Sequence, residues 1–302
     1  MIILVTGGSG LIGRRLIPFL ESLGHRVVRL VRSRDRIGEK AIFWSTAAGR
    51  FHWEDPDGID AVVHLAGESI MGRWTPAKKA RIRDSRVDTT RKLCEFLATL
   101  ESPPATLVAA SAIGFYGDRG EELLGEESLS GDGYLPRVCR QWEAATGPAH
   151  QAGIRVVNLR IGVVLTPEGG ALARMYTPFR LGLGGRIGDG RQYMSWISRE
   201  DLTAIIRFAL ETEDLAGPVN AVSPQPVTNA EFTRILGMVL KRPTSFTVPS
   251  FLVQLAFGEM GRDLLLASSR VRPERLLEAE FAYRHPDLKS ALDDLLQRRT
   301  PS

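Results

Sequence analysis

Short apolar runs alternate with longer amphipathic segments along the first half of the chain. Residues 2–5 (IILV) carry no polar side chain, which is typical of a strand buried on both faces of a parallel sheet. Apolar residues then recur at helical spacing between positions 11 and 23, and residues 26–32 are predicted to be a second strand. Further strands are predicted at 41–45, 60–67, 105–111 and 155–160, and further helices at 75–100, 134–151 and 249–268.

This alternation predicts an α/β fold. Successive strand–helix–strand units build a doubly wound, Rossmann-like parallel sheet with helices on both faces. Beyond position 165 the chain becomes rich in glycine and then mostly helical, although residues 218–222 are expected to return to the sheet.

A glycine-rich turn joins the first strand to the first helix. Residues 6–13 read TGGSGLIG, with glycines spaced by three. Gly7 allows a tight reversal, Gly10 lets backbone N–H groups approach a pyrophosphate, and Gly13 lets the helix pack closely on the sheet. The helix N-terminus adds positive potential for the phosphates. In this context the spacing predicts a dinucleotide site formed by Gly7, Gly10, Leu11, Ile12 and Gly13.

The end of the second strand indicates which dinucleotide binds. NAD sites place an Asp or Glu there, which accepts hydrogen bonds from the ribose 2′-OH. No carboxylate occurs between Arg26 and Arg34, and Arg32 stands at the strand end. Because a guanidinium pairs well with a phosphate, we predict NADP(H) rather than NAD(H), with Arg32 as the main contact. The alternative is that Arg32 is a solvated strand end.

These patterns predict two domains. Residues 1–165, together with about 200–222, are expected to form the NADP-binding Rossmann domain. Residues 166–199 and 223–302 are expected to form a small, mostly helical domain on the substrate side. In open α/β sheets ligands bind beyond the carboxyl ends of the strands, so this second part would cover the nicotinamide end of the cofactor.

Composition narrows the class of protein. A chain of 302 residues with 43% hydrophobic residues can bury a full core. The net charge of +4 is small and the arginines are scattered, so we expect no nucleic-acid partner. Cys94 and Cys139 fit a reducing, cytoplasmic location better than a disulfide scaffold.

No apolar run reaches about eighteen residues and no secretory signal is visible, so we expect no membrane partner. A small-molecule substrate is expected, no metal site is predicted, and the oligomeric state stays open.

Several stretches resemble the extended short-chain dehydrogenases/reductases. They are the turn at 6–13, HLAG at 64–67, SAIGFYG at 111–117, and Trp142-Glu143. The block at 180–197 and the segment PSFLVQLAFGEMGRDLLL near the C-terminus resemble a narrower, atypical branch, the epimerase family of the NAD-dependent epimerase/dehydratase superfamily. The resemblance implies a Rossmann-like NADP domain with a small C-terminal domain of unknown function. It also implies that Leu65 and Ala66, in HLAG, contact the cofactor.

The chain departs from this superfamily at the catalytic positions. Ordinary members use Ser or Thr, Tyr and Lys, and the Tyr exchanges a proton with the substrate oxygen. Alignment on Glu143 places Leu135 at the Tyr position and Cys139 at the Lys position, and neither side chain can replace the original. Tyr134 is adjacent, but one helical position rotates a side chain by about 100°. We expect Tyr134 to point away from the nicotinamide unless the helix begins irregularly.

Other candidates remain for the reaction and for the cofactor. Ser111 is the nearest hydroxyl, although the alignment places Ala112 where many epimerases keep theirs. Arg86 replaces a common Asn, and the resemblance suggests that it contacts NADP; the alternative is a solvated helix face. Cys139 is either a thiolate base or nucleophile, or a small buried residue that fills the space of the lost Lys, and the second is favoured. His64 is expected to be structural.

Two functions follow from these observations. The first is an NADP-dependent oxidoreductase or epimerase that acts on a small hydroxyl- or carbonyl-bearing metabolite, with nucleotide sugars included, and with Ser111 or water relaying protons. The second is a non-catalytic regulator or redox sensor that binds NADP(H). The missing Tyr and Lys favour the regulator, whereas the large C-terminal part favours the enzyme, towards which we lean.

Overall fold

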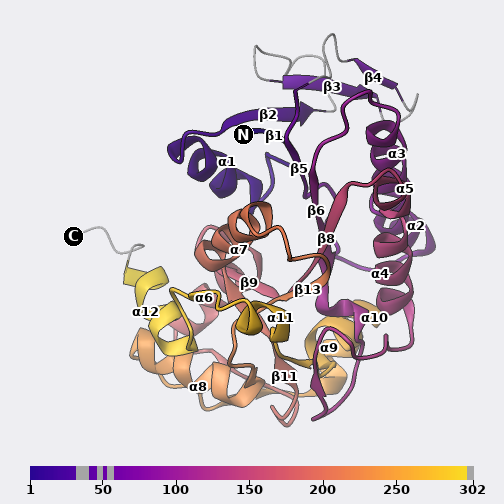
Figure 1. The fold of residues 1–302 in the computed structure, drawn as a ribbon. Coiled ribbons are helices and arrows are strands. Elements are labelled where there is room, and N and C mark those ends of the chain that lie inside the picture. The colour runs from indigo at the N-terminus through magenta and orange to yellow at the C-terminus, as the bar shows by residue number, and fades with distance from the viewer. Residues whose placement is uncertain (32–40, 46–49, 53–57, 298–302) are drawn as a thin grey trace.

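A twisted sheet forms the centre of the computed structural model, which describes residues 1–31, 41–45, 50–52 and 58–297 (Figure 1). Within these residues its spatial order is β13 (Gly217–Ala221), β8 (Arg155–Ile161), β6 (Thr106–Ala112), β5 (Ala61–His64), β1 (Ile2–Thr6), β2 (Arg26–Val31), β3 (Ala41–Ser45) and β4 (Arg50–His52). All neighbours pair in parallel except β3 and β4. The strand order reverses between β1 and β5, and doubly wound sheets bind ligands at such a switch point.

Helices cover both faces of this sheet. On one face lie α1 (Gly13–Ser22) and α7 (Arg199–Glu211), and on the other lie α3 (Val87–Ala98), α4 (Tyr134–Ala144) and α5 (Gly147–Gln151) (Figure 1). Side chains of β1 alternate between the two resulting cores: Ile3 and Val5 pack with α1 and α7, whereas Leu4 packs with α3. The predicted doubly wound, Rossmann-like fold is therefore confirmed.

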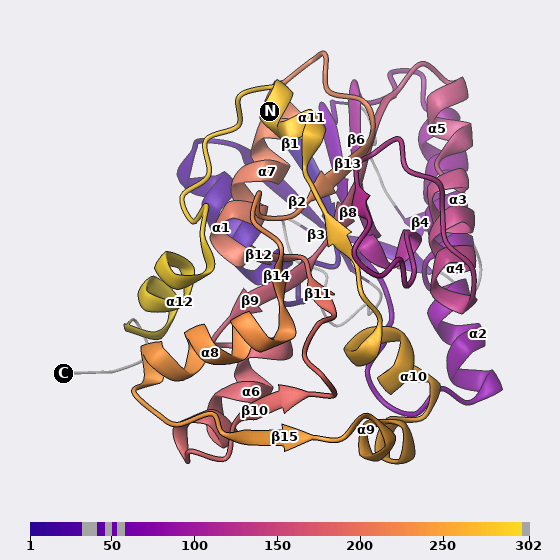
Figure 2. The ribbon, with the colours of Figure 1, turned by 90° about the horizontal axis from the view of Figure 1, so that it is seen from below.

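Shorter elements connect the sheet and build the C-terminal part. They are α2 (Pro76–Asp84), η2 (Ile113–Phe115), β7 (Leu123–Leu124), β9 (Val163–Thr166), α6 (Gly170–Arg180), β10 (Gly185–Ile187), β11 (Tyr193–Met194), β12 (Trp196–Ser198), β14 (Val227–Thr228), α8 (Asn229–Leu240), β15 (Phe246–Val248), α9 (Ser250–Phe257), α10 (Glu259–Gly261), η3 (Arg262–Leu266), β16 (Arg270–Val271), α11 (Glu274–Glu278) and α12 (Leu288–Gln297). Side chains of α6, α8 and α12 form a third core around Trp196. Figure 2 shows these three helices together beside the small β10–β15 pair. The return of β13 to the main sheet agrees with the prediction for residues 218–222, while the division into two domains stays a prediction.

Two predicted helices are each interrupted. The segment 75–100 breaks at Ser85 and Arg86, where the Ser85 hydroxyl donates to the carbonyl of Ile82 (3.1 Å). The segment 134–151 breaks where the Thr146 hydroxyl donates to the Glu143 carbonyl (2.7 Å), just before Pro148, which has no N–H to donate. The prediction of a continuous helix was wrong for both segments, because apolar periodicity does not register an interruption of two residues.

The apolar segment 249–268 also differs from its prediction as a core or lid helix. It divides into α9, α10 and the π-helical turn η3, and most side chains of α9 are exposed. In the described residues, no helix combines the length and the apolar character needed to cross a bilayer.

Candidate functional site

The turn between β1 and α1 depends on its glycines. Gly7 has a positive φ of 70°, and a Cβ added there would lie 2.7 Å from the backbone carbonyl carbon of Leu65. A Cβ on Gly13 would lie 2.5 Å from the oxygen of Gly7. The Gly10 N–H closes the turn by donating to that same oxygen (2.9 Å). Any larger residue at 7 or 13 would push backbone against backbone, so the turn is tightly constrained.

The N-terminus of α1 suits an anion. Ile12 at the cap makes no side-chain hydrogen bond, and the first turn of the helix carries no acidic residue. Gly10 is exposed, so its bare backbone faces the open side of the turn. A helix end with these properties presents N–H donors and positive potential to a phosphate. The residues present therefore fit a dinucleotide diphosphate.

The side chains of Leu11 and Ile12 pack against other parts of the chain, which leaves their backbone at the turn. Ile12 packs against the core beneath α1. A Cβ on Gly169 would lie 2.8 Å from Leu11 Cδ1, so the turn before α6 lies directly against the glycine turn. Arg32, the predicted 2′-phosphate contact, lies outside the described residues. The choice between NADP(H) and NAD(H) accordingly stays a prediction from the sequence.

A chain of buried polar groups ties the end of β5 to the turn and to α4. The Thr6 hydroxyl accepts hydrogen bonds from the N–H groups of Leu65 (3.1 Å) and Ala66 (3.2 Å). His64 contacts Thr6 through Nδ1 (2.7 Å) and Thr90 through Nε2 (2.9 Å). Burial lowers the pKa of His64 to about 4, so the ring is neutral at neutral pH. This arrangement fixes the two residues predicted to contact the cofactor and gives His64 a structural position.

The indole of Trp142 extends this chain onto α4 by donating from Nε1 to the Thr90 hydroxyl (3.0 Å). The Arg86 guanidinium lies over the same indole, with Cζ 5.0 Å from the ring centroid. Arg86 Nη1 also donates to the backbone carbonyls of Glu68 (2.9 Å) and Ile82 (3.2 Å). Arg86 is thus held at the break between α2 and α3, beside the strand end that carries Leu65 and Ala66, and not on a freely solvated helix face.

The first turns of α4 hold no proton donor of the usual kind at the positions aligned with Tyr and Lys. Leu135 and Cys139 are buried and face Gly114, where an added Cβ would lie 3.5 Å from Leu135 Cβ and 3.8 Å from Cys139 Sγ. Burial raises the pKa of Cys139 to about 12, so its thiol stays protonated. This position does not support the thiolate hypothesis and favours the space-filling alternative.

Tyr134 is used to dock a neighbouring helix. The helix begins at this residue after Gly133, whose φ is 111°, and the phenol donates to the carbonyl of Lys79 in α2 (2.7 Å). Its ring packs edge-on against Trp74, with centroids 5.3 Å apart. Burial raises the pKa of Tyr134. Tyr134 therefore packs towards α2, while its direction relative to the nicotinamide stays a prediction. Burial lowers the pKa of Arg86.

Ser111 points into a buried ion pair. Its hydroxyl donates to Glu143 Oε1 (2.6 Å), and the same carboxylate is paired in bidentate fashion with Arg160, with both N–O distances 2.9 Å. Arg160 also donates to the Tyr116 hydroxyl (2.9 Å). Sequence reasoning missed this network. Its one signal was the pair of polar residues, Asn158 and Arg160, within the otherwise apolar stretch RVVNLRI, since a buried charge needs a partner.

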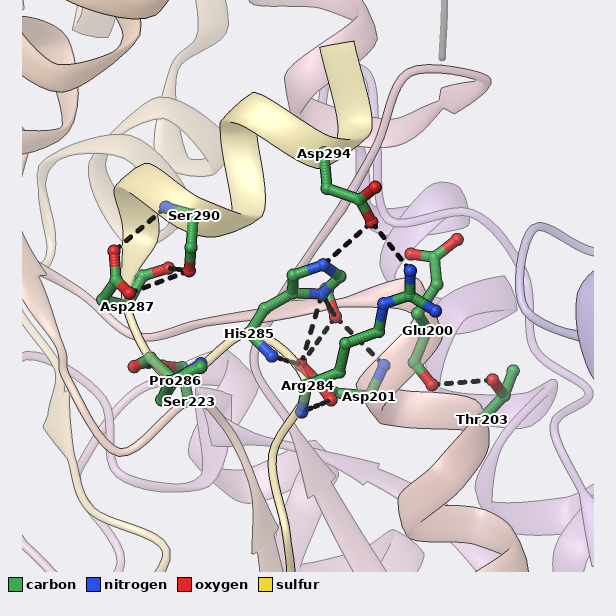
Figure 3. Close-up of polar contacts among 11 residues, drawn as sticks. Glu200, Asp201, Thr203, Ser223, Arg284, His285, Pro286, Asp287, Ser290 and Asp294 are labelled. Atoms are coloured by element: carbon green, nitrogen blue, oxygen red, sulfur yellow. Dashed lines mark hydrogen bonds and ion pairs between the residues drawn. The ribbon is translucent and has the colours of Figure 1, made fainter. Parts of the chain in front are cut away.

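A second polar cluster joins the C-terminal segment to α7 (Figure 3). His285 contacts the hydroxyl of Ser198 through Nδ1 (2.9 Å) and Asp294 through Nε2 (3.0 Å). This resembles a Ser–His–Asp triad in composition only. Ser198 is completely buried and caps α7, where its hydroxyl accepts from the N–H of Asp201 (3.0 Å). The cluster anchors α12. Within the described ranges, no three His, Cys, Asp or Glu side chains are placed to hold a metal ion.

Comparisons with known proteins agree with this geometry. The model of the NAD dependent epimerase/dehydratase family matches residues 3–222, and a domain of unknown function, DUF1731, matches residues 248–295. Epimerase family protein Mb2239 of Mycobacterium bovis is 43% identical over 292 residues, which are 96% of each chain.

Two solved structures are similar over nearly the whole chain. Human epimerase family protein SDR39U1 (isoform2), crystallised with NADPH, matches with a TM-score of 0.91 and 35% identity, over 98% of this chain and 99% of that one. A nucleoside-diphosphate sugar epimerase from Corynebacterium glutamicum matches with a TM-score of 0.81 and 39% identity, over 98% of this chain and 58% of that one. The chain belongs to the NAD-dependent epimerase/dehydratase family, in the branch of epimerase family proteins with a C-terminal DUF1731 domain.

Proposed function

We propose that this protein binds NADP(H) across the turn between β1 and α1 and acts as an oxidoreductase or epimerase on a small hydroxyl- or carbonyl-bearing compound, a class that includes nucleotide sugars. The observation that carries the proposal is the glycine turn. Side chains at Gly7 and Gly13 would collide with backbone, and the cap of α1 is left open to an anion. The NADPH in the crystal structure of the human relative supports the same cofactor.

Different residues of the chain are assigned to different parts of the bound cofactor. Backbone N–H groups at the start of α1 are assigned to the diphosphate, and Leu65 and Ala66 line the adjacent strand end. Arg86 supplies a fixed positive charge beside them, suited to a phosphate, a ribose or a substrate oxygen. The bound nicotinamide would supply the hydride chemistry.

Proton transfer needs a different route from that of ordinary family members. Leu135 has no exchangeable proton, and the buried thiol of Cys139 stays neutral at neutral pH. Arg86 can stabilise negative charge on a substrate oxygen, but a guanidinium does not release its proton in this pH range. We assign the proton relay to water or to Ser111, whose hydroxyl is already hydrogen-bonded to Glu143.

The second candidate is a non-catalytic protein that responds to NADP(H). The apolar contacts of Leu135 and the docking of Tyr134 onto α2 favour it, because both take side chains of the helix start away from acid–base work. Such a regulator requires that the oxidised and reduced cofactors bind with different affinities.

Cofactor choice is tested by fluorescence titration of the protein with NADPH and with NADH. NADPH should bind more tightly, and Arg32→Asp should weaken NADPH while NADH is affected much less. Equal or tighter binding of NADH by the unchanged protein would refute the NADP(H) assignment.

Catalysis is tested by incubating the protein with NADPH or NADP⁺ and a panel of carbonyl compounds, alcohols and nucleotide sugars. Loss of nicotinamide absorbance, or formation of an epimer, supports the enzyme, and Arg86→Gln should reduce that turnover. If no compound reacts while NADP⁺ and NADPH differ strongly in affinity, the regulator replaces the enzyme as the better proposal.

A further inference from the structure

An apolar surface lies on the C-terminal part, away from the glycine turn. Fourteen large apolar side chains are exposed in the described part of the chain, and eight of them gather on three neighbouring segments. We call this group the α9 surface. It consists of Leu181, Leu183, Phe246, Val248, Phe251, Leu252, Leu255 and Phe257.

The segments of the α9 surface are adjacent in space. β15 pairs in parallel with β10, α9 follows β15 directly, and Figure 2 shows the three along one edge of the molecule. Leu255 is 82% exposed and Phe251 is 65% exposed, whereas Val253 is the buried residue of this helix. Side chains exposed to this degree project from the surface and do not line a hollow. Patches of this kind mark interaction sites on soluble proteins.

The charged residues within 169–188 and 232–258 are all basic. The exposed side chains of Arg180, Arg186, Lys241 and Arg242 come from the segments that carry the α9 surface. Arg242 Nε donates to the carbonyl of Arg180 (2.8 Å), which brings the ends of α6 and α8 together. Neither 169–188 nor 232–258 contains an Asp or Glu.

Four acidic residues border these two ranges directly in sequence. Asp189 accepts a hydrogen bond from the Arg191 N–H (3.0 Å), and Glu259 forms an ion pair with Lys79. Glu168 pairs with Arg199, and Glu231 belongs to the capping box of α8. The projecting apolar side chains are therefore accompanied by cations that no carboxylate of the same segments neutralises.

We propose that the α9 surface binds the surface of a lipid bilayer that contains anionic headgroups. Projecting Phe and Leu side chains can enter the boundary between headgroups and acyl chains, while the arginines and Lys241 pair with the phosphates. A second copy of this chain is a poorer occupant, because a symmetric contact would bring these cations against each other. The proposal departs from our expectation of no membrane partner, which rested on the absence of a spanning segment, and it is independent of the proposed function.

Sedimentation with lipid vesicles tests this proposal on the full chain. The protein should bind vesicles that contain phosphatidylglycerol and phosphatidylcholine, and bind those of phosphatidylcholine alone at least tenfold more weakly. Rising salt should weaken the binding, because exposed charges are screened within about 10 Å at 0.1 M ionic strength. Equal binding to both kinds of vesicle, or to neither, would overturn the proposal.

Matched variants locate the binding surface. The double variant Phe251→Ser/Leu255→Ser should lose vesicle binding at least tenfold, and Arg180→Gln/Lys241→Asn should lose the dependence on phosphatidylglycerol. Leu129→Ser is the control, because Leu129 is 81% exposed on the loop before α4 and should leave binding unchanged. Circular dichroism checks that each variant is folded, and NADPH titration checks the distant turn. If Leu129→Ser and Phe251→Ser/Leu255→Ser weaken binding equally, the surface is wrongly assigned.

Light scattering distinguishes between a lipid bilayer and a second copy of the chain as the partner of the α9 surface. Without lipid, the unchanged protein and Phe251→Ser/Leu255→Ser should have the same mass. A dimer that this double variant dissociates would show that another copy covers the α9 surface, and would overturn the assignment to lipid.

Discussion

The glycine turn and the start of α4 lie on the same edge of the sheet but differ in what they retain. At the turn, every feature that a dinucleotide diphosphate needs is present, and Gly7 and Gly13 tolerate no side chain. At the start of α4, the two positions that the family resemblance aligns with the Tyr and Lys of ordinary members hold Leu135 and Cys139. The backbone geometry that suits a diphosphate and the apolar packing at the start of α4 therefore belong to separate local structures.

Packing is consistent with Leu135 and Cys139 at the start of α4. Leu135 is part of an apolar cluster with Trp74 and Met260, so the C-terminal part contributes a Met side chain where α4 begins. A charged Lys at position 139 would be buried with the nearest carboxylate, Glu143, already paired with Arg160. Burying a charge without a partner is costly, and the small thiol avoids that cost.

The largest effect is expected from the ion pair behind α4. Arg160→Met leaves the buried Glu143 carboxylate without its partner and should lower the free energy of unfolding by about 3–5 kcal/mol. Urea denaturation measures this loss. Arg207→Met, which removes an exposed pair with Glu211, is the control and should cost about 1 kcal/mol or less. NADPH affinity of the folded protein should change little, and a parallel loss of affinity would show that the two regions are not separate.

Acid should lower the stability of the folded protein through His64, which lies buried between the glycine turn and α4. Its pKa in the folded protein is about 4, below the ordinary value of 6.5, because the buried ring stays neutral. The unfolded chain therefore binds a proton first as the pH falls, and stability should decrease between pH 6.5 and 4 by a total of about 3 kcal/mol. Denaturation across this range measures the slope. His64→Leu should be less stable at pH 7 but should have a flatter profile, and an unchanged slope would contradict this origin.

The turn itself is tested by adding one methyl group. Gly13→Ala places a Cβ against the oxygen of Gly7 and should reduce NADPH affinity about a hundredfold, because a displacement near 1 Å is enough for such a loss. Fluorescence titration measures the affinity. Gly147→Ala is the matched control, since a Cβ at the start of α5 meets no atom within 4 Å. If Gly13→Ala bound NADPH as tightly as the unchanged protein, the glycine turn would tolerate a side chain, and the contrast with the start of α4 would be wrong.

The smallest effect is expected at Cys139. Because its pKa is about 12, the folded protein should react with iodoacetamide at this position far more slowly than the urea-unfolded protein. Mass spectrometry of the labelled peptide checks this. Cys139→Ala should cost about 1 kcal/mol of stability and leave NADPH affinity and any turnover unchanged. Fast labelling of the native thiol, or lost turnover, would restore the thiolate hypothesis.

The sequence predicted what neighbouring residues determine by themselves. Apolar runs and the GxxGxxG spacing are local, so the sheet and the turn were predictable without coordinates. The break at Ser85 and Arg86 was not, because two residues barely disturb a periodic pattern over 26 positions. The partner of Arg160 was not predictable either, since Glu143 comes from a different element and only the packing of α4 on β8 selects it. The exposure of α9 was missed because an apolar segment has the same pattern inside and outside a core.

The hydroxyl of Thr6 has a consequence for how the cofactor side of the molecule could be observed. It already accepts two backbone N–H groups, from Leu65 and Ala66, so its own proton is directed to Nδ1 of His64. The imidazole must then carry its hydrogen on Nε2 and give it to Thr90. The backbone of Leu65 and Ala66 thereby selects the tautomer of a ring buried behind it. Nitrogen NMR shifts of that imidazole would register whether this backbone is seated.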